Sequence, residues 1–269
     1  MRINTNLNGM IATNQMAKNT ALAGNSMEKL STGLRITKAG DDAAGLAVSE
    51  KMRAQIRGME QAERNVQDGI SMVQTAEGAL EEAGNIAQRM RELAVQAGND
   101  TLDTKDRTKI KGELTQLQKE MSNIAEETTF NGNKLLGGTN RNFTIQAGAN
   151  GETRTVTMED LSGVANNLSA LDVTSNATAK SAIANIDTAL ESINSARAGL
   201  GAMQNRLEYT SSNLTTSTEN LTAAESRIRD VDVAKEMVKL SKLNILNQAS
   251  QAMVSQAKQQ PESVTQLLR

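Results

Sequence analysis

Two long stretches of the chain carry apolar residues at intervals of seven. The first runs from residue 46 to about 97, and its row consists of Met52, Met59, Val66, Val73, Leu80, Ala87 and Ala94. The second runs from residue 182 to 231, and its row consists of Ile186, Ile193, Leu200, Leu207, Leu214, Leu221 and Ile228. A seven-residue apolar repeat is typical of a helix that buries one seam against another helix. The two rows therefore predict the core of one elongated helical rod.

A shorter helix is predicted directly after the first of these stretches. Asp103 or Thr104 can cap its first turn, because a side-chain oxygen there accepts a hydrogen bond from a free backbone N–H. The apolar stripe of this helix advances in steps of four and three and consists of Ile110, Leu114, Leu117, Met121 and Ile124. Such a stripe can lie antiparallel on the first long helix.

Between these helices and the second long stretch, the apolar period changes. Phe143 and Ile145 alternate with polar residues, as do Val156 and Met158. Alternation of this kind predicts two strands, and the turn residues 148–151 would join them into a small β-hairpin near residues 142–158. Residues 163–180 are rich in Asn, Ser, Thr and Ala, and we expect them to form an exposed connection.

The two ends of the chain have a different pattern. Residues 237, 240, 243 and 246 are all apolar, yet at about 100° per residue they point to every side of a helix. A helix that is apolar all round must be buried all round, and at a chain end this indicates burial by other molecules. A central core helix of one globule is the alternative. The residues expected to meet other copies are Leu7, Met10, Ile11, Leu22, Met237, Leu240, Leu243, Ile245, Leu246 and Met253.

Apolar burial is also expected to pair the two ends, because both carry more positive than negative side chains and charge cannot attract them. In the free subunit we expect these ends to be largely disordered, since ordering them without partners costs about 1–2 kcal/mol of backbone entropy per residue. The predicted fold class is mainly α. It is an elongated antiparallel coiled-coil or helical-bundle rod with a small β-hairpin, plus paired terminal helices.

Composition narrows the range of functions. The 269 residues include no Cys, His or Trp. Without histidine, the commonest general base and the Glu-x-x-His metal motif of helical bundles are missing, so we expect no enzyme activity and no cofactor. The adjacent carboxylates Asp41-Asp42 and Glu81-Glu82 are expected to cap helices or face solvent. A net charge of −2 without basic and aromatic clusters argues against nucleic acid as a partner. Without a long apolar run or a cleavable leader, neither membrane insertion nor signal-peptide export is expected.

Several motifs of the chain, in order, resemble those of the bacterial flagellin family. They are Met1 to Asn6, Lys29 to Ile36, Asp41 to Ala47, Phe130-Asn131-Gly132, Ala224 to Asp232, Gln248 to Met253, and Leu267-Leu268. The resemblance implies a structural subunit that polymerises into the flagellar filament for swimming motility. It also implies an inner tube domain, D0, made of residues 1–45 and 227–269. The rod domain, D1, would be made of residues 46–179 and 180–226. The outer variable domains would be missing in this short form.

The resemblance further implies where the protein acts and what it meets. Type III export would carry the chain out of the cell to the flagellum with the help of an export chaperone. The filament would also contact the hook-associated junction proteins and the filament cap. A patch similar to the segment read by the vertebrate Toll-like flagellin receptor consists of Gln88, Arg89, Glu92, Leu93 and Glu113. The end similar to that sensed by inflammasome receptors consists of Leu267, Leu268 and Arg269.

Two other functions are compatible with the heptad pattern. A flagellar hook-associated junction protein also pairs its terminal helices, but such proteins resemble flagellins mainly at the ends of the chain. A cytosolic coiled-coil adaptor would show the same seven-residue rows. It would have no need of apolar helices at both termini.

Overall fold

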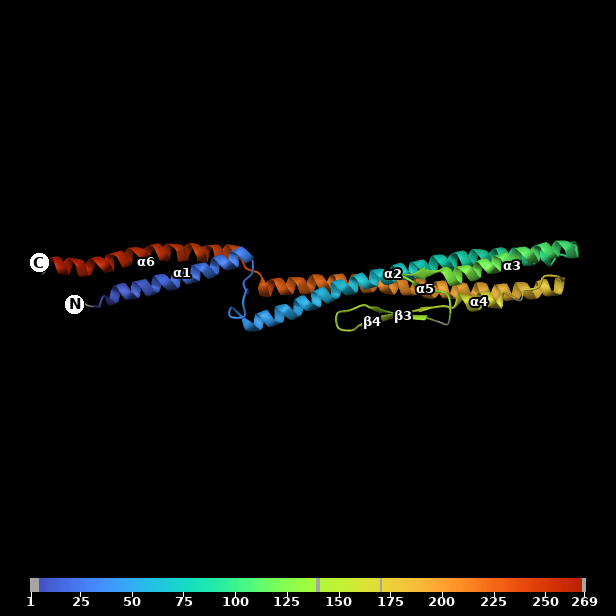
Figure 1. The fold of residues 1–269 in the computed structure, drawn as a ribbon, viewed down its shortest axis with the longest axis horizontal. Helices are drawn as coiled ribbons and strands as arrows, with labels where there is room; N and C mark the ends of the chain where they lie inside the picture. The colour runs from blue at the N-terminus through green and yellow to red at the C-terminus, as the bar shows by residue number, and fades with distance from the viewer. Residues whose placement is uncertain (1–4, 139–140, 170, 268–269) are drawn as a thin grey trace. The chain divides into compact units, whose positions relative to one another are not determined.

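The computed structural model describes residues 5–138, 141–169 and 171–267, with side chains up to residue 259 (Figure 1). Its helices are α1 (Leu7–Thr32), α2 (Ala43–Ala97), α3 (Thr104–Glu127), α4 (Leu161–Asn167), α5 (Asn176–Arg229) and α6 (Val233–Leu267). Its strands are β1 (Thr129–Phe130), β2 (Asn133–Lys134), β3 (Arg141–Gln146) and β4 (Thr153–Met158). The expected mainly α class with a small antiparallel hairpin is confirmed.

The chain divides into two compact units. The larger unit consists of residues 55–219, and the terminal unit consists of residues 1–54 and 220–269. Both boundaries fall inside helices, in α2 and α5.

In the larger unit, α2 and α5 pack antiparallel. Arg91 Nε lies 2.6 Å from Asp187 Oδ1, and Thr215 Oγ1 donates to Glu63 Oε1 at 3.2 Å. The end of α2 therefore lies beside the beginning of α5, and the two helices run in opposite directions. The row residues buried here are Met59, Val66, Val73, Leu80, Ile186, Ile193, Leu200, Leu207 and Leu214. Met52 and Leu221, which belong to the terminal unit, are half-buried. The seam of the larger unit is therefore aliphatic throughout.

Strands β3 and β4 form the predicted hairpin, in which Phe143 faces Val156. Its side chains lie against α2 where that helix has glycines. A Cβ at Gly58 would come within 2.8 Å of the Ala149 Cβ, and one at Gly69 would overlap Ile145. The missing side chains leave room for the hairpin to approach the helix backbone closely.

The expectation that residues 163–180 form an exposed connection is wrong in part. Asp160 caps the short helix α4 by accepting a hydrogen bond from the Ser162 backbone N–H at 3.0 Å. The apolar residues buried in this region are Leu161, Ala165, Leu168 and Val173. Helix α4 packs against α3, and Lys111 Nζ lies 3.0 Å from Asp172 Oδ1. A few apolar residues spaced for one helical face outweighed the polar composition around them.

In the terminal unit, α1 and α6 lie side by side and antiparallel (Figure 1). Asn6 Nδ2 donates to the Ala257 carbonyl at 2.7 Å, and Thr20 Oγ1 donates to Asn247 Oδ1 at 3.4 Å. In the structure both ends are helical over residues 7–32 and 233–267, and the expected disorder of the ends in the free subunit stays a prediction. The two helices partner each other, which offsets part of the entropy cost of ordering them.

Leu207→Asp tests whether the buried row holds the larger unit together. Leu207 is fully buried, so an unpaired carboxylate there should cost roughly 4 kcal/mol and lower the melting temperature by about 10 °C. The matched control is Tyr209→Asp, because Tyr209 lies two residues further on α5 and is 78% exposed. Thermal melts followed by far-UV circular dichroism make the comparison. If both variants melt like the parent, the row is not the core.

Candidate assembly surface

The fully buried positions between α1 and α6 hold mainly small and polar side chains, and the large apolar side chains of Met16, Leu30, Leu240 and Val254 are half-buried in these helices. On α1 the buried positions are seven residues apart and are occupied by Ala12, Asn19 and Ser26. On α6 they are also seven apart and are occupied by Leu243, Ser250 and Ala257. Leu243 is the one large apolar side chain among these six. Apolar and polar side chains therefore share the contact between the two ends.

Most of the large apolar side chains of α1 and α6 face away from this seam. Val238 and Ile245 are 72% and 62% exposed. Eight of the predicted residues are exposed: Leu7, Met10, Ile11, Leu22, Met237, Ile245, Leu246 and Met253. Sequence reasoning missed three further exposed apolar residues, which are Met27, Val233 and Val238. Leu240 is half-buried and Leu243 is buried, both on the α1 side of the helix. A concentration of exposed apolar side chains of this extent marks a surface that other molecules cover.

A short backbone bridge ties together the connectors that follow α1 and precede α6. Gly33 ends α1 in the left-handed conformation with φ of 71°, and its carbonyl accepts from the Val231 N–H at 3.0 Å. The Arg35 N–H donates to the Arg229 carbonyl at 2.6 Å. The Arg229 guanidinium in turn pairs with Glu50 at 2.6 Å. Sequence reasoning missed this bridge, because nothing in the local pattern shows that residues 33–35 and 229–231 are neighbours.

Asp42 caps α2, whereas Asp41 holds the turn of the connector before it. Asp42 Oδ1 accepts from the Gly45 N–H at 2.9 Å, at the start of α2. Asp41 Oδ2 accepts from the backbone N–H groups of Thr37 and Lys38, and these two bonds hold the pKa of Asp41 below its ordinary value. The carboxylate pair thus shapes the connector before α2.

The predicted receptor patch is partly exposed. Arg89 forms ion pairs with Glu92 at 3.0 Å and with Glu113, on α3, at 2.9 Å, and Gln88 is exposed beside them. Leu93 is only 2% exposed and belongs to the packing of the larger unit. At the other predicted immune site, the side chain of Leu267 and all of residues 268–269 lie outside the described residues.

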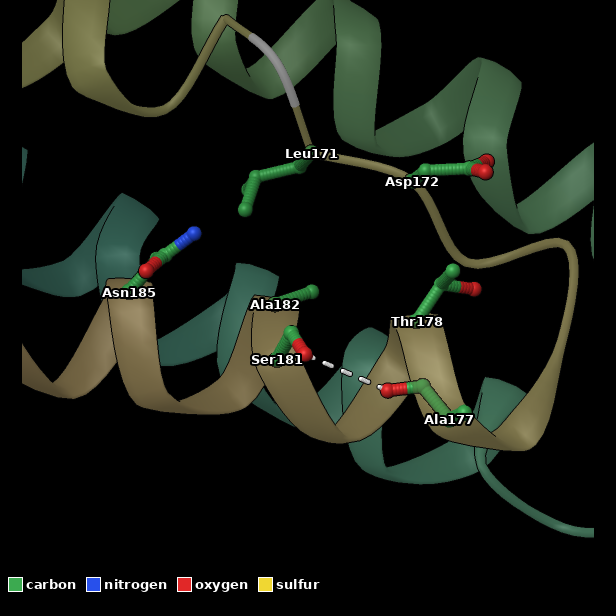
Figure 2. Close-up of a pocket in the computed structure, with 7 residues that line it drawn as sticks. All are labelled: Leu171, Asp172, Ala177, Thr178, Ser181, Ala182 and Asn185. Atoms are coloured by element: carbon green, nitrogen blue, oxygen red, sulfur yellow. Dashed lines mark hydrogen bonds between the residues drawn. The ribbon is translucent and has the colours of Figure 1, made fainter.

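Figure 2 shows a shallow hollow of about 310 Å³ in the larger unit, beside the start of α5. Several of its polar groups already have partners within the chain. Ser181 Oγ donates to the Ala177 carbonyl at 3.3 Å, and Asp172 accepts from Lys111 and Thr174 at 3.0 and 2.9 Å. These contacts, that to Lys111 first, hold the pKa of Asp172 below its ordinary value. The hollow therefore offers a ligand little that is not already used within the chain.

The described part of the chain lacks two features of other protein classes. Its His, Cys, Asp and Glu side chains form no group of three or more that could hold a metal ion. Among the same residues, no helix contains an apolar stretch that is long enough to cross a bilayer.

Comparison with known proteins gives matches along nearly the whole chain. Residues 3–141 match the family described as the bacterial flagellin N-terminal helical region, and residues 183–268 match the bacterial flagellin C-terminal helical region. The chain is 55% identical over 272 residues to a flagellin of Halalkalibacterium halodurans and 49% identical over 304 residues to a flagellin of Bacillus subtilis. Both alignments cover 100% of this chain and of the relative.

Solved structures give the same picture. The crystal structure of Bacillus cereus flagellin aligns with a TM-score of 0.51 at 36% identity, over 60% of this chain and 94% of that one. A protein described as flagellar hook-associated, from Vibrio parahaemolyticus, aligns with a TM-score of 0.62 over 71% of this chain and 100% of that one. At 16% identity, the second likeness concerns the fold alone.

The half-buried Glu236 has a lowered pKa, which predicts that the stability of the terminal helix pair depends on pH. Its pKa lies below the ordinary 4.5, first because of the Ser26 hydroxyl on α1 and then because of the ion pair with Lys239 at 3.0 Å.

Because the folded pKa of Glu236 is depressed, its contribution to stability is complete above pH 4.5 and is lost as the pH falls through the folded value. Thermal melts between pH 3 and 6 should therefore show a smaller loss of stability on acidification in Glu236→Gln than in the parent. Glu219→Gln, at an exposed glutamate of α5, should keep the parent's pH dependence. Identical pH dependence in all three proteins would show that Glu236 has no such role.

Proposed function

The chain belongs to the bacterial flagellin family and is a structural subunit of the flagellar filament, and from this premise we propose that the outward faces of α1 and α6 are the surface through which copies polymerise. The observation that carries this proposal is the row of exposed large apolar side chains on these two helices, beside a seam of small and polar ones. A hook-associated junction protein is not favoured, since the flagellin matches span the full chain at high identity.

Apolar burial is large enough to drive this assembly. Fully burying a Leu, Ile or Met side chain contributes about 1.5–3 kcal/mol, whereas association costs about 4–15 kcal/mol. The eleven exposed large apolar side chains of α1 and α6 are a little over half exposed on average, so burying all of them contributes roughly 9–19 kcal/mol, which is comparable to or above that cost. The exposed charges in these helices add little, because ion pairs in solvent are worth about 1 kcal/mol or less.

In this proposal residues 1–45 and 227–269 form the inner tube domain, and residues 46–179 and 180–226 form the rod around it. Neighbouring copies would cover the terminal helices on every outward side, and each copy's own α1–α6 seam would remain internal. Residues 160–180, which include α4, leave little chain for an outer domain. The rod would therefore be the outermost layer of the filament.

Membership of the family supports the route and the partners that go with a filament. The filament is extracellular, and we propose that the chain leaves the cell through the flagellar type III apparatus with an export chaperone on its C-terminal segment. The hook-associated junction and cap proteins would meet the same terminal helices at the two ends of the filament. The flagellin family is a family of structural proteins, and we propose that this chain likewise has no enzymatic role.

The immune contacts are proposed from the same resemblance. Gln88, Arg89, Glu92 and Glu113 are exposed together and would form the contact for the vertebrate Toll-like flagellin receptor, with Leu93 packed beneath them. Residues 267–269 would form the end sensed by inflammasome receptors. If rods also contact each other through the Arg89 patch, a receptor could read only free subunits.

Ile245→Asp tests the proposed surface. Ile245 is 62% exposed in the single chain, so the variant's melting curve should match the parent's. In the filament the carboxylate would be buried among apolar side chains, and a penalty of about 4 kcal/mol would raise the concentration needed for growth about a thousandfold. Seeded polymerisation measures this concentration.

Two variants control for this test. Ile245→Leu keeps an apolar side chain at the same position and should assemble like the parent. Leu246→Asp places the charge on the next outward position and should fail as Ile245→Asp does. Growth of both aspartate variants at the parent's concentration would reject the proposed surface.

A further inference from the structure

Methionine occupies different environments in the two units of this chain. The sequence contains 13 methionines. Those buried in the larger unit are Met59, Met72, Met90, Met121 and Met158. Four others, on α1 and α6, are 54–58% exposed and are called the terminal methionines: Met10, Met27, Met237 and Met253. Met16, Met52 and Met203 are half-buried. Among the described residues, every exposed methionine therefore belongs to a terminal helix.

The thioether is the group of this chain that a peroxide oxidises most readily, because the sequence has neither thiols nor indoles. The sulfur lone pair attacks one peroxide oxygen, so an S–O bond forms as the O–O bond breaks. Sulfur loses two electrons, and the proton of the transferred hydroxyl joins the departing hydroxide to give water and a sulfoxide. Oxidation turns a flexible apolar side chain into a polar one. Access of the peroxide to the sulfur decides which methionines react first.

A sulfoxide has different consequences in the free subunit and in an assembly. At an exposed position its oxygen is hydrated, so the free subunit tolerates it. Covered by the apolar side chains of another copy, the same oxygen would lose water and gain no partner, which is costly. The terminal methionines stand among such side chains, since Ile11 next to Met10 is 59% exposed and Val238 next to Met237 is 72% exposed.

We propose that the four terminal methionines form a redox modification site, at which a peroxide converts free subunits into a form that does not polymerise. This inference rests on the proposed function, because it takes the outward faces of α1 and α6 as the assembly surface. The buried methionines of the larger unit are shielded, so that unit keeps its fold. Once copies have assembled, they cover the terminal methionines as well, and the filament resists the same oxidant.

The site does not require α1 and α6 to be paired in the free subunit. The terminal methionines are exposed even where these helices lie together, and separation of the helices would leave them no less exposed. Their reaction with peroxide therefore precedes assembly in either case.

Hydrogen peroxide on the full-length protein tests the selectivity of the site. Free subunits below the assembly concentration are treated, and peptide mass spectrometry follows the gain of oxygen at each methionine. The terminal methionines should react at least about tenfold faster than Met90 and Met121, which have no exposed surface. Thermal melting of the larger unit should stay unchanged. In assembled filaments the terminal methionines should react at least about tenfold more slowly than in free subunits.

Seeded polymerisation of the oxidised subunits tests the consequence. The concentration needed for growth should rise at least about thirtyfold, which corresponds to about 2 kcal/mol. Reduction by methionine sulfoxide reductases A and B should restore the original concentration.

Two multiple variants control for this test, each compared with its own untreated sample. Leucine at all four terminal methionines keeps the apolar volume and removes the sulfur, so peroxide should leave assembly unchanged. The matched variant, Met16→Leu with Met52→Leu and Met203→Leu, keeps the terminal methionines and should lose assembly as the parent does.

Three results would overturn the proposal. The first is equal oxidation of terminal and buried methionines in free subunits. The second is growth of the oxidised parent at its untreated concentration, and the third is the same loss of assembly in the variant without terminal methionines. Ile245→Asp, which involves no sulfur, separates this inference from the proposed function. Normal growth of that variant rejects the assembly surface, whereas its failure beside normal growth of the oxidised parent rejects the redox site alone.

Discussion

In α1 and α6, the side chains that are fully buried between the two helices are mostly not the large apolar side chains, which are mainly exposed to solvent. Small residues such as Ala12 and Ala257 let the helices approach closely while burying little apolar area. The larger side chains, Ile245 and Met253 among them, are left outside. A pair built in this way is a weak core for a single chain and a strong surface for association. In the proposed assembly, polymerisation follows from that imbalance, since the unburied apolar area would be covered when other copies arrive.

The larger unit uses its apolar residues in the opposite way. The rows along α2 and α5 are buried within the chain, from Val66 to Leu214. Ion pairs between these helices, such as Arg91 with Asp187, are half exposed and contribute modestly to stability beside that burial. Glycines at 58 and 69 let the β3–β4 hairpin pack directly on α2. One unit of the chain is thus self-sufficient, and the other is completed by its neighbours.

The sequence-based predictions agree best with the structure where a single periodic pattern of apolar residues determines the element. Seven-residue rows predicted α2 and α5, and period-two alternation around Phe143 and Val156 predicted the hairpin. Prediction failed where composition was used in place of pattern, as with α4, whose few apolar residues are buried despite polar surroundings. It was incomplete for the terminal seam, because only apolar residues were counted. Counting polar residues at seven-residue spacing would have found Asn19 and Ser26 in line with Ala12.

By itself the sequence determined that the chain is helical, that two long helices share an aliphatic seam, and that both ends carry more apolar side chains than one seam can bury. These properties are periodic and local, so they can be read from spacing. Only the tertiary structure decided which face of each terminal helix is turned inward. It also decided that residues 33–35 meet 229–231, and that Asn19 lies opposite Ser250. Those facts depend on the register between segments more than 190 residues apart, and no spacing along the chain encodes a register between two helices whose repeats are equal.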